Sequence, residues 1–363
     1  MKKQLLFLFL SISTLVFSQE AYYLNAPNAV DFSLNGMALK NALIAKISNN
    51  TTALPYSSSS FDTWDALMLT DVNPQNSNEV LLIYGWENGS DNDVRNVRER
   101  DITNNGGSTG QWNRDHVFPK SLATPSLETG NPGPGTDIHN LRPSDVQWNS
   151  ARGNLPFAAG SGNSGPVGSN WYPGDEWKGD VARIIMYMYL RYDGNGSSIT
   201  ETQCLPTVVG VGNVVANDPN MIDLFLQWNA EDPVSDIERQ RNPVSEDKQN
   251  NRNPFIDNPF LATKIWGGPP AEDVWGTLGV DEIAQNTFSI YPIPANEHKI
   301  FIRSTAAIIK QVALFTMTGQ QILSENNPQK NNNQIVLDNL PSGFYVLKIH
   351  SEKGITSKKV LIN

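Results

Sequence analysis

Two segments determine the expected fold of the first part of this chain: WNRDHVFPKS at residues 112–121 and GTDIHNLRPSDVQWNSARGNLPF at residues 135–157. The first predicts an extended segment that ends at Pro119, because proline cannot donate a backbone hydrogen bond. Residues 128–136 read ETGNPGPGT, a composition typical of an irregular connection. The expected order is therefore a strand, a long loop and the second segment.

A short helix is expected in the second segment. Ser144 followed three residues later by Gln147 is the signature of a capping box, so the helix should begin at Asp145. Gly153 is a suitable residue to end it. His116 would then lie on the strand and Asn149 on the helix.

These segments carry the side chains that a phosphodiester-cleaving metal site needs. A neutral imidazole, with an ordinary pKa of about 6.5, can take a proton from water near neutral pH, which makes His116 the candidate general base. Mg²⁺ keeps several waters and needs one or two protein oxygens, which Asp115 and the Asn149 amide can supply. Because adjacent side chains on a strand point to opposite faces, a local turn must aim Asp115 and His116 at one cleft. Arg142 and Arg152 add positive charge nearby.

Length and composition indicate ordinary globular protein. The 363 residues are 39% hydrophobic and 18% charged, which suggests two domains. Residues 1–18 have a basic start and a short apolar run, as in a secretory signal peptide, and no other run is long enough to cross a membrane. Cys204 is the single cysteine, so no internal disulfide can form.

The charge balance excludes a protein that coats nucleic acid through a broad basic surface, since the net charge is −10. Residues 19–275 carry 17 Lys/Arg and 31 Asp/Glu, a net of −14. A polyanionic substrate would have to meet a local basic groove and metal ions. The segment with Arg239, Arg241 and Arg252 is the candidate for that groove, with ordinary solvated arginines as the alternative.

The remaining elements of the first part follow from hydrophobic periodicity. The pattern predicts a helix over 37–50, a buried strand from Glu79 to Trp86, a helix within 171–192 capped by Asp180, and a helix over 219–231. Ser235 with Glu238 forms another capping box. Pro243 is expected to divide the segment that follows into two short helices.

The fold class that we expect is α+β, with a small all-β sandwich after the mostly helical part. Residues 267–287 contain Gly-Gly-Pro-Pro and small or acidic residues and are interpreted as a linker between residues 19–266 and 288–363. From residue 288 the apolar residues alternate at period two between turns, the pattern of a β-sandwich.

The first part of the chain resembles the endonuclease I family of secreted and periplasmic nucleases, which belong to the ββα-metal group. The likeness lies in the two segments quoted above, in YYLNA near residue 22, in VLLIYGW at 80–86, in WKGDVARIIMYMYLRY and in NNRNPFIDNP, and it spans roughly 20–266. It implies a mostly helical domain around a ββα-metal finger. It also implies metal-dependent, sequence-nonspecific cleavage of DNA, often of RNA as well.

The resemblance implies roles for individual residues. His116 would activate the water, and Asp115 and Asn149 would hold the metal, Mg²⁺ or alternatively Mn²⁺ or Ca²⁺. The family usually has Glu where this chain has the shorter Asp115, which affects the metal distance. Because residues 121–136 contain no arginine, we expect positively charged side chains from other segments to contact the phosphate. The candidates are Lys120, Arg142, Arg152 and Arg252, with His139 either touching phosphate or, as we favour, bracing the site.

The end of the chain resembles the C-terminal sorting domain of the type IX secretion pathway. The likeness lies in FSIYPIPA, LFTMTGQQIL and LPSGFYVLKI. It implies the type IX machinery as a partner and a secreted or cell-surface protein; we expect a monomer without stable membrane insertion.

Two other functions remain open from the sequence. One is a non-catalytic surface or matrix protein that binds DNA or glycan on the same fold. The other is a metal-dependent phosphodiesterase for smaller substrates, which a closed pocket would favour over an open groove.

Overall fold

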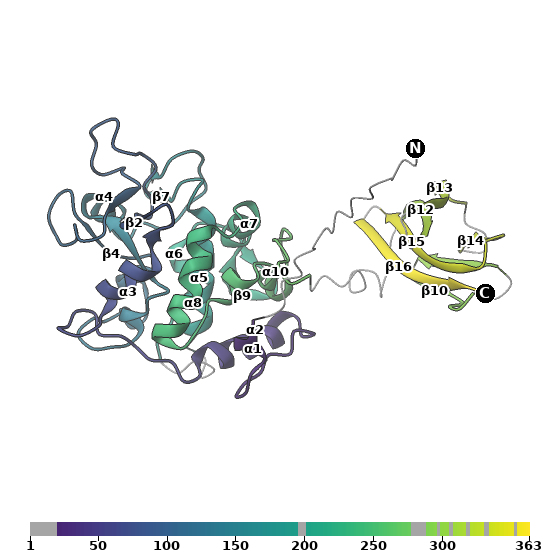
Figure 1. Ribbon diagram of the computed structural model, residues 1–363, viewed down its shortest axis with the longest axis horizontal. Coiled ribbons are helices and arrows are strands. Elements are labelled where there is room, and N and C mark those ends of the chain that lie inside the picture. The colour runs from purple at the N-terminus through teal and green to yellow at the C-terminus, as the bar shows by residue number, and fades with distance from the viewer. Residues whose placement is uncertain are drawn as a thin grey trace, which may run out of the picture. The chain divides into compact units, whose positions relative to one another are not determined.

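The computed structural model describes residues 20–194, 201–276, 288–295, 298–304, 308–316, 320–329, 334–351 and 354–363. The chain forms two compact units, Met1–Trp275 and Gly276–Asn363, which we describe separately (Figure 1). The expected signal peptide at 1–18 lies outside the described residues. None of the described helices has the length and apolar character needed to cross a membrane.

The first unit is mostly helical, and the α+β expectation is confirmed. Its helices are α1 Ala21–Leu24, α2 Gly36–Ser48, α3 Thr63–Thr70, α4 Val146–Arg152, α5 Lys178–Arg191, α6 Pro206–Val209, α7 Asp223–Glu231, α8 Asp236–Gln249, α9 Pro254–Asp257 and α10 Phe260–Trp266. Its strands are β1 Val72–Asn73, β2 Asn76–Leu81, β3 Glu99–Asp101, β4 Trp112–His116, β5 Leu141–Asp145, β6 Gly165–Val167, β7 Asn170–Tyr172, β8 Val214–Val215 and β9 Asp218–Ile222. Short 3-10 turns occupy Lys120–Leu122 and Pro134–Thr136.

Helix α5 forms the centre of this unit. Almost every one of its side chains is buried, and it packs against α2, α7 and α9. Figure 1 shows it in the middle of the unit, with β4 and α4 on one side and α2 and α10 on the other. The expected cap is wrong: Trp177 occupies the N-cap position, while Asp180 lies in the first turn and is ion-paired with Arg142.

Strands β4 and β5 pair antiparallel, and α4 follows β5 directly. Asp115 lies opposite Arg142, and His116 lies opposite Leu141. The cap of α4 is Asp145, whose carboxylate accepts from the backbone N–H groups of the first helical turn. The prediction of Ser144 as the cap is therefore wrong. The helix ends at Gly153, which adopts a φ of 54°, as expected for a glycine stop.

A buried network of charges ties β5 to α5 and α8. Arg142 contacts Asp71 at 2.6 Å and Asp180 at 2.8 Å, and Arg241 is ion-paired with the same Asp71. Arg183 of α5 contacts Glu238 of α8 at 2.6 Å. Removing one partner from such a network leaves an uncompensated buried charge, at a cost of about 3–5 kcal/mol.

Three elements differ from their predictions. The strand expected to run to Trp86 ends at Leu81, because the chain then turns and the N–H groups of Leu82 and Ile83 bond to Arg98 and Pro143. The helix expected from 219 begins at Asp223, after strand β9. Pro243 does not divide α8.

Helix α8 continues through Pro243 because of where that residue lies. Pro243 and Arg239 are both on the exposed face of α8, so the carbonyl that lacks its helical partner can bind water. The predicted capping box of Ser235 with Glu238 is confirmed.

Part of the expected linker packs onto the first unit. Trp275 is buried, and its ring lies 5.7 Å from that of Tyr23 and 4.9 Å from that of Phe32. The structure thus adds residues up to 275 to the first unit, whereas residues 277–287 lie outside the described chain.

The second unit is all-β, as expected. Its strands are β10 Phe288–Tyr291, β11 Ile300–Ser304, β12 Ile309–Thr316, β13 Gln321–Asn326, β14 Ile335–Leu337, β15 Gly343–Ser351 and β16 Gly354–Ile362. They form one sheet of order β10-β11-β14 and another of order β13-β12-β15-β16. Apolar side chains from both sheets share one core, the arrangement of a sandwich.

Candidate active site

Strand β4 presents its candidate residues on two sides. Side chains alternate along a strand, so Asn113 and Asp115 project to one side, and Arg114 and His116 project to the other. The first side faces α4, since Asn149 of that helix bonds to Asn113. The second side faces residues 135 and 56, which contact His116.

The proton on the His116 ring is fixed by one hydrogen bond. Its Nε2 lies 2.7 Å from the carbonyl oxygen of Gly135. A carbonyl can only accept, so Nε2 carries the hydrogen and donates it, which leaves Nδ1 with a free lone pair. His116 is therefore held in the tautomer in which Nδ1 can accept a proton.

The surroundings keep this imidazole neutral. Burial lowers the pKa of His116 to about 4, although the hydrogen bond to Gly135 opposes that shift, and the charges of Lys120, Arg114 and Arg152 lower it further. The residue is 8% exposed, and its ring stacks on Tyr56, with the ring centroids 5.8 Å apart. At neutral pH the group is a base.

Asp115 lies deep on the other side of β4, with 2% of its surface exposed. The hydroxyl of Tyr84 donates to its Oδ2 at 3.0 Å, and Nη1 of Arg152 lies 3.7 Å from Oδ1. Burial raises the pKa of the carboxyl group, whereas Arg152 and the Tyr84 hydroxyl lower it. A cation bound beside Asp115 would stabilise the ionised form.

Asn149 joins the same side of the strand. Its Nδ2 donates to Oδ1 of Asn113 at 2.7 Å, which leaves the side-chain oxygen Oδ1 of Asn149 available. Nowhere in the described residues do three or more His, Cys, Asp or Glu side chains gather in a metal-binding group. A metal here would use one carboxylate and amide oxygens, and this donor set fits Mg²⁺, which needs few protein oxygens.

Arg152 acts as a clamp on the end of β4. It is fully buried, and its Nη1 donates to the carbonyls of His116 at 3.0 Å and Gly153 at 3.2 Å, while Nη2 donates to that of Val117. The guanidinium thus fixes the backbone of His116 rather than facing solvent.

Two other predicted arginines form ion pairs with carboxylates of the protein. Arg142 is fully buried between Asp71 and Asp180. Arg252 holds Asp257 at 2.5 Å and Glu246 at 2.7 Å. The geometry does not support a phosphate contact for either residue.

The groove expected around Arg252 is likewise not supported. Arg241 is buried against Asp71, and the exposed Arg239 pairs with Asp236 at 3.2 Å. Each of these arginines is held by a carboxylate.

The last two predicted residues, His139 and Lys120, differ in their exposure to solvent. His139 is buried, contacts the Asn251 carbonyl at 3.2 Å and packs on the Tyr187 ring, which suits bracing rather than phosphate contact. Lys120 is exposed and begins the 3-10 turn that directly follows Pro119. Its charge acts on the imidazole of His116.

Four contacting residues were missed from the sequence. Asn113 could have been found, because it is two residues from Asp115 and so shares its side of the strand. Tyr84, Tyr56 and Gly135 come from distant segments, and Gly135 acts through its backbone. Local pattern carries no signal for such contacts.

Comparison with known proteins covers both units. A family model described as Endonuclease I matches residues 35–260, and a model described as a secretion system C-terminal sorting domain matches residues 289–363. An extracellular ribonuclease of Bacillus amyloliquefaciens is 41% identical over 254 residues, which cover 68% of this chain and 78% of that protein. An extracellular ribonuclease of Bacillus subtilis (strain 168) is 42% identical over 238 residues, covering 64% and 75%.

Proposed function

The chain belongs to the endonuclease I family, and we propose that it hydrolyses phosphodiester bonds of DNA and RNA with His116 as the general base and one divalent metal ion held by Asp115 and Asn149. The C-terminal sorting domain indicates a secreted or cell-surface nuclease. Both Bacillus relatives are named ribonucleases, which supports RNA as a substrate beside DNA. The observation that supports this function most directly is the neutral His116 ring, whose Nδ1 atom is free to accept a proton.

The base works through Nδ1 of His116. This atom takes a proton from water while the water oxygen attacks phosphorus and the bond from phosphorus to the leaving sugar oxygen breaks. The leaving oxygen takes a proton from solvent, and the imidazolium returns its proton to solvent. The carbonyl of Gly135 keeps the second ring proton on Nε2, so the ring does not switch to the unproductive tautomer. Stacking on Tyr56 limits rotation of the ring.

The metal would be held on the α4 side of β4. The chemistry that a divalent ion, Mg²⁺ in our proposal, would supply when bound there is neutralisation of charge on the phosphate and on the leaving oxygen. The Asp115 carboxylate and the side-chain oxygen of Asn149 would hold it. Asn113 fixes the Asn149 amide group by accepting a hydrogen bond from its Nδ2. Tyr84 orients Asp115 in the same way.

Positive charge for the substrate comes from Lys120, which is exposed next to His116. Arg152 is a positioning residue, since it touches backbone carbonyls at the end of β4. The succession of β4, β5 and α4 supports a ββα-metal finger as the catalytic element. We propose residues 19–275 as the catalytic domain.

The experiment that tests this function is digestion of plasmid DNA and of structured RNA by the purified full chain. We expect cleavage of both with Mg²⁺ and none with EDTA. Tight binding of either polymer without cleavage, in any divalent metal, would instead support the non-catalytic binding protein. Hydrolysis of small phosphodiesters alone would support the other function left open by the sequence, a metal-dependent phosphodiesterase for smaller substrates.

A further inference from the structure

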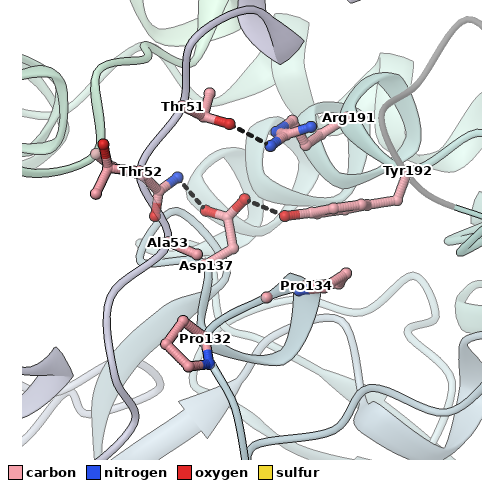
Figure 2. Close-up of a pocket in the computed structure, with 10 residues that line it drawn as sticks. Thr51, Thr52, Ala53, Pro132, Pro134, Asp137, Arg191 and Tyr192 are labelled. Atoms are coloured by element: carbon pink, nitrogen blue, oxygen red, sulfur yellow. Dashed lines mark hydrogen bonds between the residues drawn. The ribbon is translucent and has the colours of Figure 1, made fainter.

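A half-buried arginine beside the candidate active site, Arg114, has no role in the mechanism above. In the described part of the first unit, every arginine except Arg114 and Arg191 forms an ion pair with a carboxylate. Arg191 is 4% exposed, its Nη2 donates to the Thr51 hydroxyl at 2.6 Å, and the charge of Asp137 acts on it (Figure 2). Arg191 therefore belongs to the interior, whereas Arg114 reaches the surface.

Aromatic rings and backbone or hydroxyl oxygens hold Arg114 in place. Its Cζ lies 3.5 Å from the centroid of the Tyr56 ring and 4.0 Å from that of the Trp64 ring. Its Nη1 donates to the carbonyl oxygen of Tyr56 and, at 2.9 Å, to the hydroxyl of Thr63. These contacts fix the plane of the guanidinium but supply no full negative charge to neutralise it.

Part of the donor capacity of Arg114 is unused at the surface. Its Nη2 donates to the hydroxyl of Ser57 at 3.2 Å, and this hydrogen bond is exposed to solvent. A guanidinium has two N–H groups on Nη2, so one remains beside the Ser57 hydroxyl, whereas Nε is buried and takes no part. Burial lowers the pKa of Arg114, and Tyr56 and Asp62 oppose that shift. A bound anion would stabilise the charged form further.

Arg114 lies on the same side of β4 as His116. Side chains two residues apart on a strand are about 7 Å apart, and both of these contact the ring of Tyr56. The charge of Arg114 also lowers the pKa of the His116 imidazole. Because a hydrogen bond reaches only about 3 Å, a phosphate held by Arg114 would be a neighbour of the phosphate attacked at His116.

We propose that Arg114 and the hydroxyl of Ser57 bind a phosphate group of the nucleic acid that is next to the phosphate cleaved at His116. The inference rests on the proposed function and adds a substrate contact to it. Arginine is suited to this role because its planar N–H groups match phosphate oxygens. The Ser57 hydroxyl can rotate to donate to the same phosphate.

This phosphate contact is tested by binding, separately from cleavage. The full chain carrying His116→Gln, which removes the base, is titrated with a short single-stranded DNA in Mg²⁺ over a range of salt concentrations, with and without Arg114→Gln. We expect Arg114→Gln to raise Kd about five- to twentyfold and to reduce the slope of log Kd against log salt by about one. Arg239→Gln, an exposed arginine paired with Asp236, serves as the matched control and should leave both quantities unchanged.

A second pair of variants leaves the arginine in place. Ser57 is exposed, so Ser57→Asp puts a carboxylate beside Nη2 of Arg114, where it neutralises the charge and takes the unused N–H. In the His116→Gln chain, Ser57→Asp should bind the DNA at least threefold more weakly than Ser57→Asn, which adds similar volume without charge. Thermal unfolding should stay cooperative in both, because neither substitution removes a buried contact.

The outcomes separate the phosphate contact from the proposed function. Parental affinity and salt slope in folded Arg114→Gln, or equal affinities in the Ser57 pair, would overturn the contact. Weaker binding with an unchanged slope would mean that Arg114 only supports Tyr56, and this would also overturn it. If Arg114→Gln does not fold, the Ser57 pair decides. Failure of the unmodified chain to cleave any nucleic acid would instead overturn the proposed function.

Discussion

At the scale of single residues, the Tyr84 hydroxyl is the contact that would orient Asp115 toward the proposed metal. It donates to a carboxyl group whose pKa is raised by burial, and this hydrogen bond lowers that pKa. Tyr84→Phe should therefore raise the Mg²⁺ concentration needed for half-maximal activity, by about tenfold, as is usual for residues that orient a metal ligand. Magnesium titrations of activity measure this.

The matched control for that prediction is Tyr172→Phe. The Tyr172 hydroxyl donates to Asp175, which is remote in sequence from both segments of the site. Its magnesium dependence should stay at the original value. An unchanged titration for Tyr84→Phe would remove Asp115 as a metal ligand.

His139 provides a prediction about pH. Burial lowers its pKa to about 4, below the value of about 6.5 expected in the unfolded chain. Between these values the unfolded state binds a proton that the folded state does not, so stability falls as the pH falls from 6.5 toward 4. His139→Asn should remove one histidine's share of this slope, about 1.4 kcal/mol per pH unit.

Urea unfolding at pH 7, 6 and 5 measures the two slopes. Comparing slopes rather than absolute stabilities cancels the contacts that the substitution itself removes. Identical slopes in both proteins would mean that His139 is not buried as a neutral base.

The residues predicted for the site form two groups: those that local structure places there, and arginines that form ion pairs elsewhere. Asp115 and His116 lie on the predicted strand and Asn149 lies on the predicted helix. The turn that would aim Asp115 and His116 at one cleft is not seen, because the two side chains project to opposite sides of β4. Arg142 and Arg252 were candidates because of their charge, and both are paired with carboxylates from other segments. Charge can be seen in a sequence, but the partner that neutralises it cannot.

At the scale of elements, the N-cap of α4 controls the position of Asn149. The Asp145 carboxylate caps this helix and also pairs with Arg100 at 2.8 Å. Asp145→Ala loses both contacts, whereas Asp145→Asn keeps an oxygen for the cap. We expect the alanine variant to be less stable than the asparagine variant by about 1 kcal/mol.

Urea unfolding of the two Asp145 variants measures the difference in stability. Their activities show whether loss of the cap also affects the active site. The alanine variant should also need more Mg²⁺, because Asn149 lies one turn along the same helix. Equal stabilities would mean that the cap contributes nothing to α4.

Element prediction succeeded where local signals decide and failed where tertiary contacts decide. The capping box at Ser235 and the glycine stop at Gly153 are local, and both are confirmed. The apolar run that ends at Trp86 was expected to be a strand, but it turns at Leu82 through contacts with remote segments. Pro243 stays within α8 because its face of the helix is exposed, and local pattern gave no sign of that.

At the scale of the whole molecule, the two units have separate cores. Every residue of the candidate site belongs to the first unit. A protein ending at residue 276 should therefore retain kcat/KM within about twofold of the full chain on both plasmid and RNA. Loss of activity in a truncated protein that still unfolds cooperatively would mean that the sorting domain contributes to catalysis.

The net charge of −14 over residues 19–275 opposes binding of a polyanion, so the site must supply attraction locally. Lys120 and the proposed metal, with Arg114 as proposed above, are the groups available for this. Their small number predicts weak binding that depends strongly on metal and salt, which suits an enzyme that releases its product more than a protein that coats nucleic acid.

The central claim, that His116 is the general base of a metal-dependent nuclease, is tested most directly by the rate of plasmid nicking in Mg²⁺ by the full chain and by its His116→Ala variant, each also with EDTA. The account predicts a loss of at least about a hundredfold in kcat, while thermal unfolding stays cooperative and nicking by the unmodified chain stops in EDTA. Nicking by His116→Ala within tenfold of the unmodified chain would contradict the claim.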